Sequence, residues 1–244
     1  MHPLPAQRVV EIWEQGRALN PVDRALLVLG FACPERTRDE LAALTIGERD
    51  ACLLEFRAQT LDSALAAFCE CASCGERLEL TFKTDELMIR PRPERPAPCE
   101  FFFGEYVVRF RLPNSKDLAA AAAFRNSSRA RQHLIERCVD EVRCNGAPAD
   151  LASLPENFPE QLSTRMAECD PQADVQLAIR CPNCQAESEF TFDISSFFWA
   201  EVTAFAKRLL REVHVLARAY GWSEAEILSL SPPRRQCYLE MVGS

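Results

Sequence analysis

The chain has 244 residues, of which 48% are hydrophobic, and this composition excludes an intrinsically disordered protein. Its formal net charge of −8 argues against nonspecific binding to nucleic acid or to an anionic membrane, because both need a positive surface. No stretch approaches the ~20 apolar residues that cross a bilayer, and the first residues lack the apolar core of a signal peptide. We therefore expect a cytoplasmic protein without a membrane partner.

Residues 1–62 predict a helical region. Asn20 is a good N-cap and Pro21 suits the first helical position. The stretches "TRDE" (Thr37 to Glu40) and "TIGE" (Thr45 to Glu48) fit the capping box, in which hydroxyl and carboxylate satisfy free backbone N–H groups. The leucines that follow each predicted helix start indicate that one face of each helix packs in a core. No residue in this region is a candidate for catalysis.

Residues 63–88 and 172–195 predict two matching hairpins. The stretch "ECASCGERLELTF" (Glu70 to Phe82) places Cys71 and Cys74 before an alternating strand, and "RCPNCQAESEFTF" (Arg180 to Phe192) repeats this pattern. Short cysteine spacing in a reducing compartment favours metal over disulfides. One turn supplies two thiolates, whereas a structural zinc takes four in a tetrahedron.

The two turns therefore predict one shared, structural zinc site formed by Cys71, Cys74, Cys181 and Cys184. A metal-free pair of turns with reduced thiols remains the alternative. A redox pair at the second turn is disfavoured, since a strand rather than a helix N-terminus follows it. Cys69 lies two residues before Cys71, but its counterpart in the second copy is Ile179, so we leave it out of the ligand set.

Residues 89–171 predict a β-α region inserted between the two half-sites. It opens with a proline-rich connector, Arg90 to Pro98, and continues with two strands around Gly104. An alanine-rich helix from Leu118 to Phe124 and a second helix from about Ser128 to Val142 are expected to follow. After a loop, the stretch from Ser163 to Asp170 predicts a short helix.

Residues 196–244 predict a helical C-terminal region. Ser195 and Ser196 are expected to cap a long helix with a continuous apolar stripe that ends at Tyr220, with Gly221 as its stop. A capping box at Ser223 and prolines after Ser231 predict two more helices. Cysteines outside the half-sites, in helical sequence, are expected to be small buried hydrophobes: Cys33, Cys52, Cys138, Cys169 and Cys237.

The sequence provides no catalytic constellation. It has no glycine-rich phosphate loop and no G-x-S-x-G turn, and His2, His133 and His214 lack metal-ligand spacing. A site closed by four thiolates is structural rather than catalytic. We therefore expect a non-enzymatic protein without a small-molecule substrate.

A zinc-ribbon nucleic-acid-binding regulatory protein is the alternative function. The first hairpin carries Arg77 and Lys83, but the second carries Glu187, Glu189 and Asp193. Because neither hairpin is strongly basic, phosphate binding is disfavoured and we expect no nucleic-acid partner.

Three further stretches resemble one protein family. They are "NPVDRALLVL" (Asn20 to Leu29), "FRLPNSKDLAAAAA" (Phe110 to Ala123) and, most specifically, the last residues from Phe197 to Val242 with "RLLREVHVLARAYGWSEAEIL". Together with the cysteine turns they resemble the baseplate hub assembly chaperones of T-even phages, in the form found in contractile injection system clusters. The cysteine turns depart from the phage proteins and match the injection-system relatives better.

This resemblance implies help in building a baseplate hub, with hub or spike proteins as partners, in the bacterial cytoplasm or within a tail-like particle. Aromatic residues near the C-terminus are candidate partner anchors, with burial in the core as the alternative: Trp199, Tyr220, Trp222 and Tyr238. The overall expectation is an α+β fold that is mostly helical, with a split four-cysteine zinc ribbon and a β-α insertion.

Overall fold

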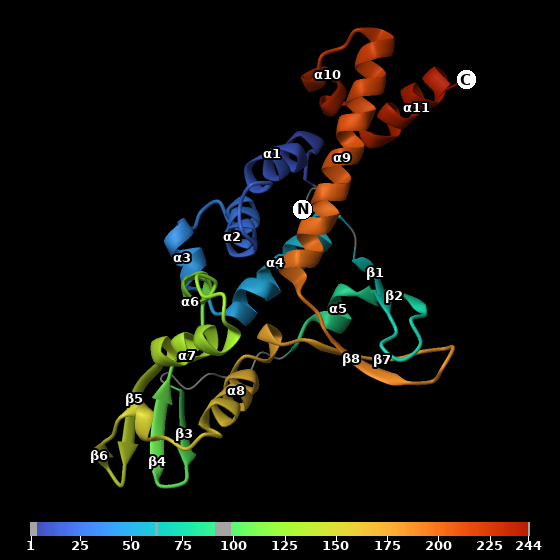
Figure 1. Ribbon diagram of the computed structural model, residues 1–244. Coiled ribbons are helices and arrows are strands. Elements are labelled where there is room, and N and C mark those ends of the chain that lie inside the picture. Colours follow the sequence, from blue (N-terminus) through green and yellow to red (C-terminus); the bar gives the residue numbers. More distant parts are fainter. Residues whose placement is uncertain (1–3, 62, 91–98, 244) are drawn as a thin grey trace.

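The computed structural model describes residues 4–61, 63–90 and 99–243. Within these residues helices predominate and three small antiparallel sheets are present, so the predicted α+β class is confirmed (Figure 1). No helix in the described part has an apolar stretch that would cross a membrane. The division into five sequence segments and the proline-rich connector stay predictions; the connector lies, apart from Arg90, outside the described residues.

Four helices form the N-terminal region, and the last three begin at the predicted caps. They are α1 (Ala6–Gly16), α2 (Pro21–Ala32), α3 (Arg38–Ala43) and α4 (Ile46–Thr60). The Asn20 side chain accepts a hydrogen bond from the Asp23 N–H at 3.0 Å. Both capping boxes form, with the Glu40 carboxylate accepting from the Thr37 N–H at 2.7 Å and Glu48 from Thr45 at 2.9 Å.

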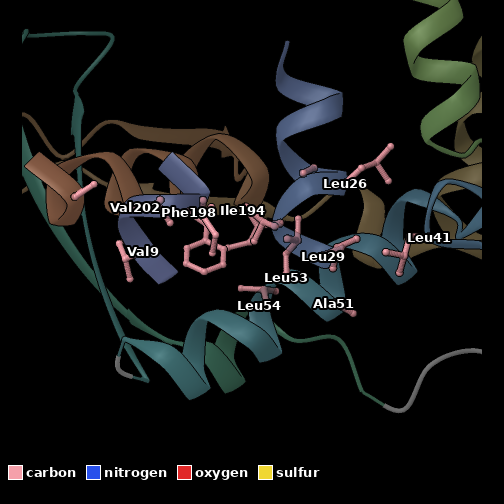
Figure 2. Close-up of a cluster of buried hydrophobic side chains, with 14 of the residues drawn as sticks. Val9, Leu26, Leu29, Leu41, Ala51, Leu53, Leu54, Ile194, Phe198 and Val202 are labelled. Carbon is pink, nitrogen blue, oxygen red and sulfur yellow. The ribbon is translucent and has the colours of Figure 1, made fainter. Parts of the chain in front are cut away.

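The long helix α9 (Ile194–Tyr220) joins the C-terminal region to these N-terminal helices in one hydrophobic core. Figure 2 shows Ile194 and Phe198 of α9 among leucines of α2 and α4. Phe198 is 2% exposed, and burying such a side chain stabilises the fold by about 1.5–3 kcal/mol. Trp199 lies against Gly16, so close that a Cβ there would come within 2.4 Å of the indole ring.

The beginning of α9 corrects one prediction. Asp193, rather than Ser195 or Ser196, is the N-cap, because its carboxylate accepts hydrogen bonds from both serine N–H groups at 2.9 and 3.2 Å. A carboxylate also interacts favourably with the positive end of the helix dipole. The predicted stop is confirmed, since Gly221 has a left-handed φ of 71° and donates its N–H to Ala217.

The inserted region has its own sheet and core. Strands β3 (Cys99–Phe103), β4 (Tyr106–Phe110), β5 (Val139–Cys144) and β6 (Ala147–Pro148) lie in that order, all antiparallel. The region also contains α6 (Ser115–Ala121), α7 (Ser127–Cys138), the 3-10 turn η1 (Leu151–Ser153) and α8 (Phe158–Cys169). Phe101, Phe110 and Phe158 form the centre of this second core.

The bounds of three helices in the insertion differ from the predictions, and α6 begins at Ser115 rather than at the expected Leu118. The helix expected to reach Val142 ends at Cys138, and Val142 pairs with Val108 in the sheet. Val139 and Val142 are β-branched and fit the pleated surface, which overrides their helical spacing. Helix α8 begins five residues before the expected Ser163, with a proline in its first turn, and α6 ends at Ala121 rather than Phe124.

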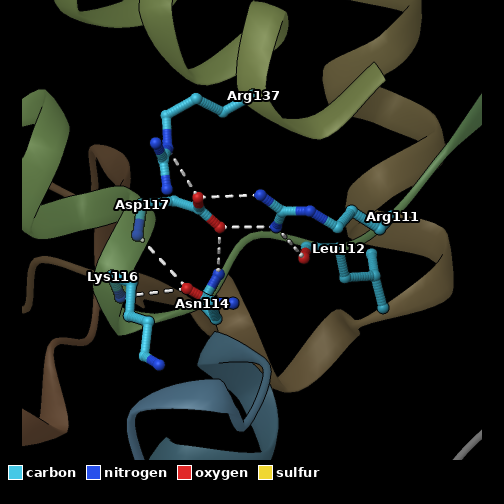
Figure 3. Close-up of polar contacts among 6 residues, drawn as sticks. All are labelled: Arg111, Leu112, Asn114, Lys116, Asp117 and Arg137. Carbon is cyan, nitrogen blue, oxygen red and sulfur yellow. Dashed lines mark hydrogen bonds and ion pairs between the residues drawn. The ribbon is translucent and has the colours of Figure 1, made fainter. Parts of the chain in front are cut away.

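A buried carboxylate explains the fold of the stretch "RLPNSKD". Asp117 is fully buried and accepts hydrogen bonds from Arg111 at 2.6 and 2.9 Å and from Arg137 at 2.8 Å (Figure 3). Burial alone would raise the pKa of Asp117, but these arginines and the Asn114 N–H outweigh it and lower the pKa to about 2. Asp117 thereby holds together the end of β4, the start of α6 and the end of α7.

The insertion is attached to the first turn of α4 and closed at its base. The Ile46 N–H donates to the Pro113 carbonyl at 3.2 Å, and the Gly47 N–H donates to the Asp170 carboxylate at 2.9 Å. At the base, in η2 (Pro171–Ala173), Gln172 accepts from the Ile89 N–H at 2.8 Å and donates to the Leu87 carbonyl at 3.1 Å. These contacts fix the insertion against the helical body.

The C-terminal helices α10 (Glu224–Ser229) and α11 (Pro232–Gly243) pack on the end of α9. Arg235 is 3% exposed and donates to Glu212 of α9 at 2.6 Å, which fixes α11. Of the five cysteines expected to be buried, Cys138 is buried, Cys33, Cys52 and Cys169 are half-buried, and Cys237 is exposed, which contradicts the prediction. Cys237 lies on α11, a helix without a marked apolar face, and its side chain is in solvent rather than in a hydrophobic core.

Candidate metal centre

The first cysteine turn joins β1 (Ala64–Glu70) to β2 (Arg77–Lys83). The Cys71 N–H donates to the Glu76 carbonyl at 2.8 Å, and the Gly75 N–H donates to the Cys71 carbonyl at 2.9 Å. Gly75 has a φ of 71°, a left-handed conformation that glycine adopts without a Cβ clash. This tight turn places the Cys71 and Cys74 thiols side by side.

The second turn joins β7 (Gln176–Arg180) to β8 (Glu187–Thr191) and repeats the same hydrogen bonds. The Cys181 N–H donates to the Ala186 carbonyl and the Gln185 N–H donates to the Cys181 carbonyl, each at 2.9 Å. Gln185 occupies the position of Gly75 with a φ of 61°, which is strained for a residue with a Cβ. Sequence similarity between the turns therefore extends to backbone conformation.

All four predicted ligand residues come together between the two hairpins. The four Sγ atoms lie within 4.8 Å of one another. Cys71 Sγ is 3.6 Å from Cys184 Sγ, and Cys74 Sγ is 3.7 Å from Cys181 Sγ. A tetrahedron with Zn–S bonds of about 2.3 Å has edges of about 3.8 Å, so these two separations match those between zinc ligands and the cluster is compatible with a metal site.

Backbone donors favour the thiolate form of Cys71, whereas at Cys184 the lowering by the Ala186 N–H is outweighed by the neighbouring thiols and burial, which raise the pKa to about 12. The N–H groups of Ser73 and Cys74 point at the Cys71 sulfur and lower its pKa to about 6. The Asn183 side-chain amide donates to the Cys74 sulfur at 3.8 Å. Such N–H···S contacts stabilise metal-bound thiolates, and soft thiolate ligands select zinc over magnesium or calcium.

The hairpins face each other through a small apolar cluster that surrounds the thiols. Leu78 and Ile179 are buried there beside Cys71 and Cys181, which are 3% and 1% exposed. Cys74 and Cys184 are exposed, so one side of the thiol cluster faces solvent. Cys69 is half-buried in the same apolar cluster and is not among the four grouped thiols.

Comparison with known proteins identifies the family. The family model described as T4 bacteriophage base plate protein matches residues 31–199. The chain belongs to this base plate protein family. Searches of curated proteins and of solved structures gave no match. The matched residues of this base plate family protein contain both cysteine turns and the whole inserted region, and they end shortly after α9 begins.

Sequence reasoning missed the residues that hold the hairpins to the body of the base plate family protein. Arg57 of α4 is 2% exposed and donates to both oxygens of Glu201 in α9 at 2.7 Å and to the Ala64 carbonyl of β1 at 2.8 Å. Gln185 and Asn183 were missed too. The alignment of Gln185 with Gly75 would have indicated the left-handed position, whereas nothing local marks Arg57 or Glu201.

Proposed function

We propose that the protein is a non-enzymatic assembly factor or component of the baseplate hub in a phage tail-like contractile injection system. The family match over residues 31–199 carries this proposal, because it covers most of the chain and names the base plate. The partners are hub or spike proteins, and the protein acts in the cytoplasm or within the assembled particle. Nucleic acid, membranes and small substrates have no part in this role.

The proposal includes one structural zinc bound by Cys71, Cys74, Cys181 and Cys184. The observed spacing of the sulfur atoms and the N–H donors around Cys71 support this ligand set. Four thiolates occupy all four coordination positions of a tetrahedral zinc ion. The metal therefore stabilises the hairpins and has no open position for a substrate. Elemental analysis of the purified protein should give about one zinc per chain.

The C-terminal aromatic residues are proposed to contact the partner. Tyr220, Trp222 and Tyr238 form one cluster, with ring centroids 4.6 to 5.6 Å apart. Tyr220 is 38% exposed, and the neighbouring Met241 is 64% exposed. Trp199 packs in the main core instead and drops out of the anchor set. Trp222→Ala is expected to weaken partner binding without unfolding the chain.

The decisive experiment is affinity purification of the tagged chain from cells that produce the complete particle. Baseplate hub or spike subunits should co-purify, and mass spectrometry identifies them. A gel shift with duplex DNA at modest salt tests the regulatory alternative, since a nucleic-acid-binding protein shifts strongly under those conditions. A strong shift together with no co-purifying baseplate subunit would refute the assembly role.

A further inference from the structure

Helix α9 carries a positively charged face that neither the main core nor the metal centre uses. It is the longest described helix, and its C-terminal half extends beyond the N-terminal helices (Figure 1). Side chains spaced three and four residues apart lie in line along a helix. In the second half of α9 such a line consists of four exposed residues, three cations and a histidine: Lys207, Arg211, His214 and Arg218. We call this surface the basic face of α9.

The basic face lies on the side of α9 that points away from the main core. Val202 and Leu209 are buried in that core, and the basic face lies about 160° round the helix from them. The residues on the same side in the first half of the helix, Ala200 and Ala204, are exposed too. The charges of the basic face therefore take no part in packing the fold.

No acid of α9 neutralises the basic face. The helix contains two, and both pair with buried arginines of other helices: Glu201 with Arg57 of α4 at 2.7 Å and Glu212 with Arg235 of α11 at 2.6 Å. Within the residues that the structure describes, the cations of the basic face form no ion pair. The face therefore has three uncompensated positive charges in a chain whose net charge is −8.

The spacing of these cations is unfavourable for the helix itself. Like charges four residues apart destabilise a helix, whereas Glu and Lys at the same spacing stabilise it. Lys207 and Arg211 have this spacing in the middle of α9, where the helix dipole does not favour a cation; it favours only Arg218 in the last turn. Solubility alone would be served better by mixed charges, so the arrangement favours an anionic binding partner.

The dimensions of the basic face favour an acidic helix over a nucleic acid. From Lys207 to Arg218 the face is about 17 Å long and only one helix wide. A nucleic-acid duplex presents phosphates over a broader surface, and the acidic remainder of the chain would repel it. In a partner helix, carboxylates that are three or four residues apart have the same spacing as these cations, so each cation can pair with one carboxylate.

We propose that the basic face of α9 binds an acidic helix of a partner protein, in which Asp or Glu recurs every three or four residues. Charge complementarity of this kind fixes orientation, speeds association and weakens with salt. No described helix of this chain carries three acids at that spacing, so a second copy does not supply the acidic helix. That the helix belongs to a baseplate subunit rests on the proposed function, whereas the chemistry of the basic face does not.

The first test is site-specific photo-crosslinking in cells that produce the complete particle. The crosslinking amino acid p-benzoylphenylalanine replaces Ala204, an exposed residue about one helical turn before Lys207 that leaves every cation in place. Ala119, an exposed alanine of α6 in the insertion, is the matched control position. We expect an adduct at Ala204 whose captured peptide contains at least three Asp or Glu residues at helical spacing. Capture of nucleic acid, lipid, a second copy of this chain or a peptide without such acids, or no adduct above the Ala119 level, overturns the proposal.

The second test measures the affinity of the captured sequence as a synthetic peptide by fluorescence anisotropy. Lys207→Glu combined with Arg211→Glu should weaken binding at least tenfold. Arg125→Glu combined with Arg129→Glu is the matched control, because these arginines are also exposed, four residues apart and without an ion pair among the described residues. The control should bind within twofold of the unmodified chain, and an equal loss in both double variants would mean that only overall charge matters and would overturn the proposal.

A third measurement leaves α9 unaltered, so it does not depend on the folding of a variant. In a second synthetic peptide, Gln and Asn replace every Glu and Asp of the captured sequence. This neutral peptide should bind the unmodified chain at least tenfold more weakly than the acidic one. Equal affinity of the two peptides refutes the role of the carboxylates.

The outcomes separate this proposal from the assembly role. If Lys207→Glu combined with Arg211→Glu leaves co-purification of baseplate subunits unchanged, the basic face is not the contact and the assembly role stands. If the captured acidic segment belongs to a protein outside the baseplate and no baseplate subunit co-purifies, the basic face stands and the assembly role fails.

Discussion

Removal of the metal is expected to unfold the two hairpins locally rather than the whole chain. The cluster between the hairpins has four buried residues in the described part of the chain, and two of these, Cys71 and Cys181, are proposed ligands. Leu78 and Ile179 would remain as the buried apolar contact, with half-buried Cys69, Leu80, Leu177 and Phe190 packed against them. The helical body has a separate and much larger core, to which Leu65 at the base of the first hairpin belongs.

The size of the effect follows from linkage. The binding free energy of a structural zinc is about 10–16 kcal/mol at a 1 M standard state. At a free zinc concentration of ~10 µM, the stabilisation of the folded hairpins by bound zinc is therefore about 3 kcal/mol or more. Burial of Leu78 and Ile179 contributes about 1.5–3 kcal/mol each, whereas every ordered residue of the hairpins costs about 1–2 kcal/mol. Without the metal the apolar contact is too small to order the turns, and 3 kcal/mol corresponds to about a 100-fold change in local opening.

Hydrogen exchange followed by mass spectrometry measures this opening. After chelation, or in Cys181→Ser, amides near both cysteine turns should exchange at least ~100-fold faster. Exchange near Leu65 and in α2, α4 and α9 should change little, because those residues belong to the main core. Cys69→Ser is the matched control and should keep both metal and protection. Unchanged protection of the turns in the metal-free chain would refute the reasoning.

Four substitutions test the backbone and side-chain geometry. Gln185→Gly should stabilise the chain by about 1 kcal/mol, because glycine removes the left-handed strain at φ 61°. Thermal melting should rise by about 2–4 °C, and Gly75→Gln should do the opposite; no change in either variant would contradict the strain argument. Asp117 has its pKa lowered from 3.8 to about 2, so its contribution of about 2 kcal/mol is complete above pH 4 and disappears as the pH falls toward 2. Asp117→Asn should therefore lower stability at neutral pH and flatten the acid-unfolding curve between pH 4 and 2, as followed by circular dichroism; a curve of unchanged shape counts against it. Gly47→Ala should cost about 2 kcal/mol in chemical denaturation, because the new Cβ would lie 2.0 Å from Asp170 Oδ1, and a neutral result would mean that Asp170 moves away freely.

Local patterns predicted the four-cysteine cluster and three of the helix caps. The cysteine turns were recognisable because each ligand pair depends on hydrogen bonds within a few residues, and because the second turn repeats the first. The caps at Asn20, Thr37 and Thr45 form for the same reason, since side chain and backbone donor are three residues apart.

Contacts between residues far apart in the chain could not be predicted from the sequence. Gln172 joins Leu87 and Ile89, and Arg57 joins Glu201, across more than eighty residues in each case, so no local spacing marks them. The boundary between α7 and β5 was misplaced because Ile135, Cys138 and Val142 have the spacing of one helix face. Val142 belongs to a strand because it pairs with β4 in the sheet. Sheet pairing is a tertiary effect that outweighs local preference.

The attachment of the insertion implies that its fold does not depend on the proposed metal site. The insertion contacts the first turn of α4 through Pro113 and Asp170, and Gln172 closes its base, so its position does not depend on the hairpins. After chelation, amides of α7 and α8 should therefore exchange within twofold of their rate in the metal-bound chain, as measured by hydrogen exchange and mass spectrometry. Exchange ~100-fold faster there would show that the hairpins also hold the insertion in place.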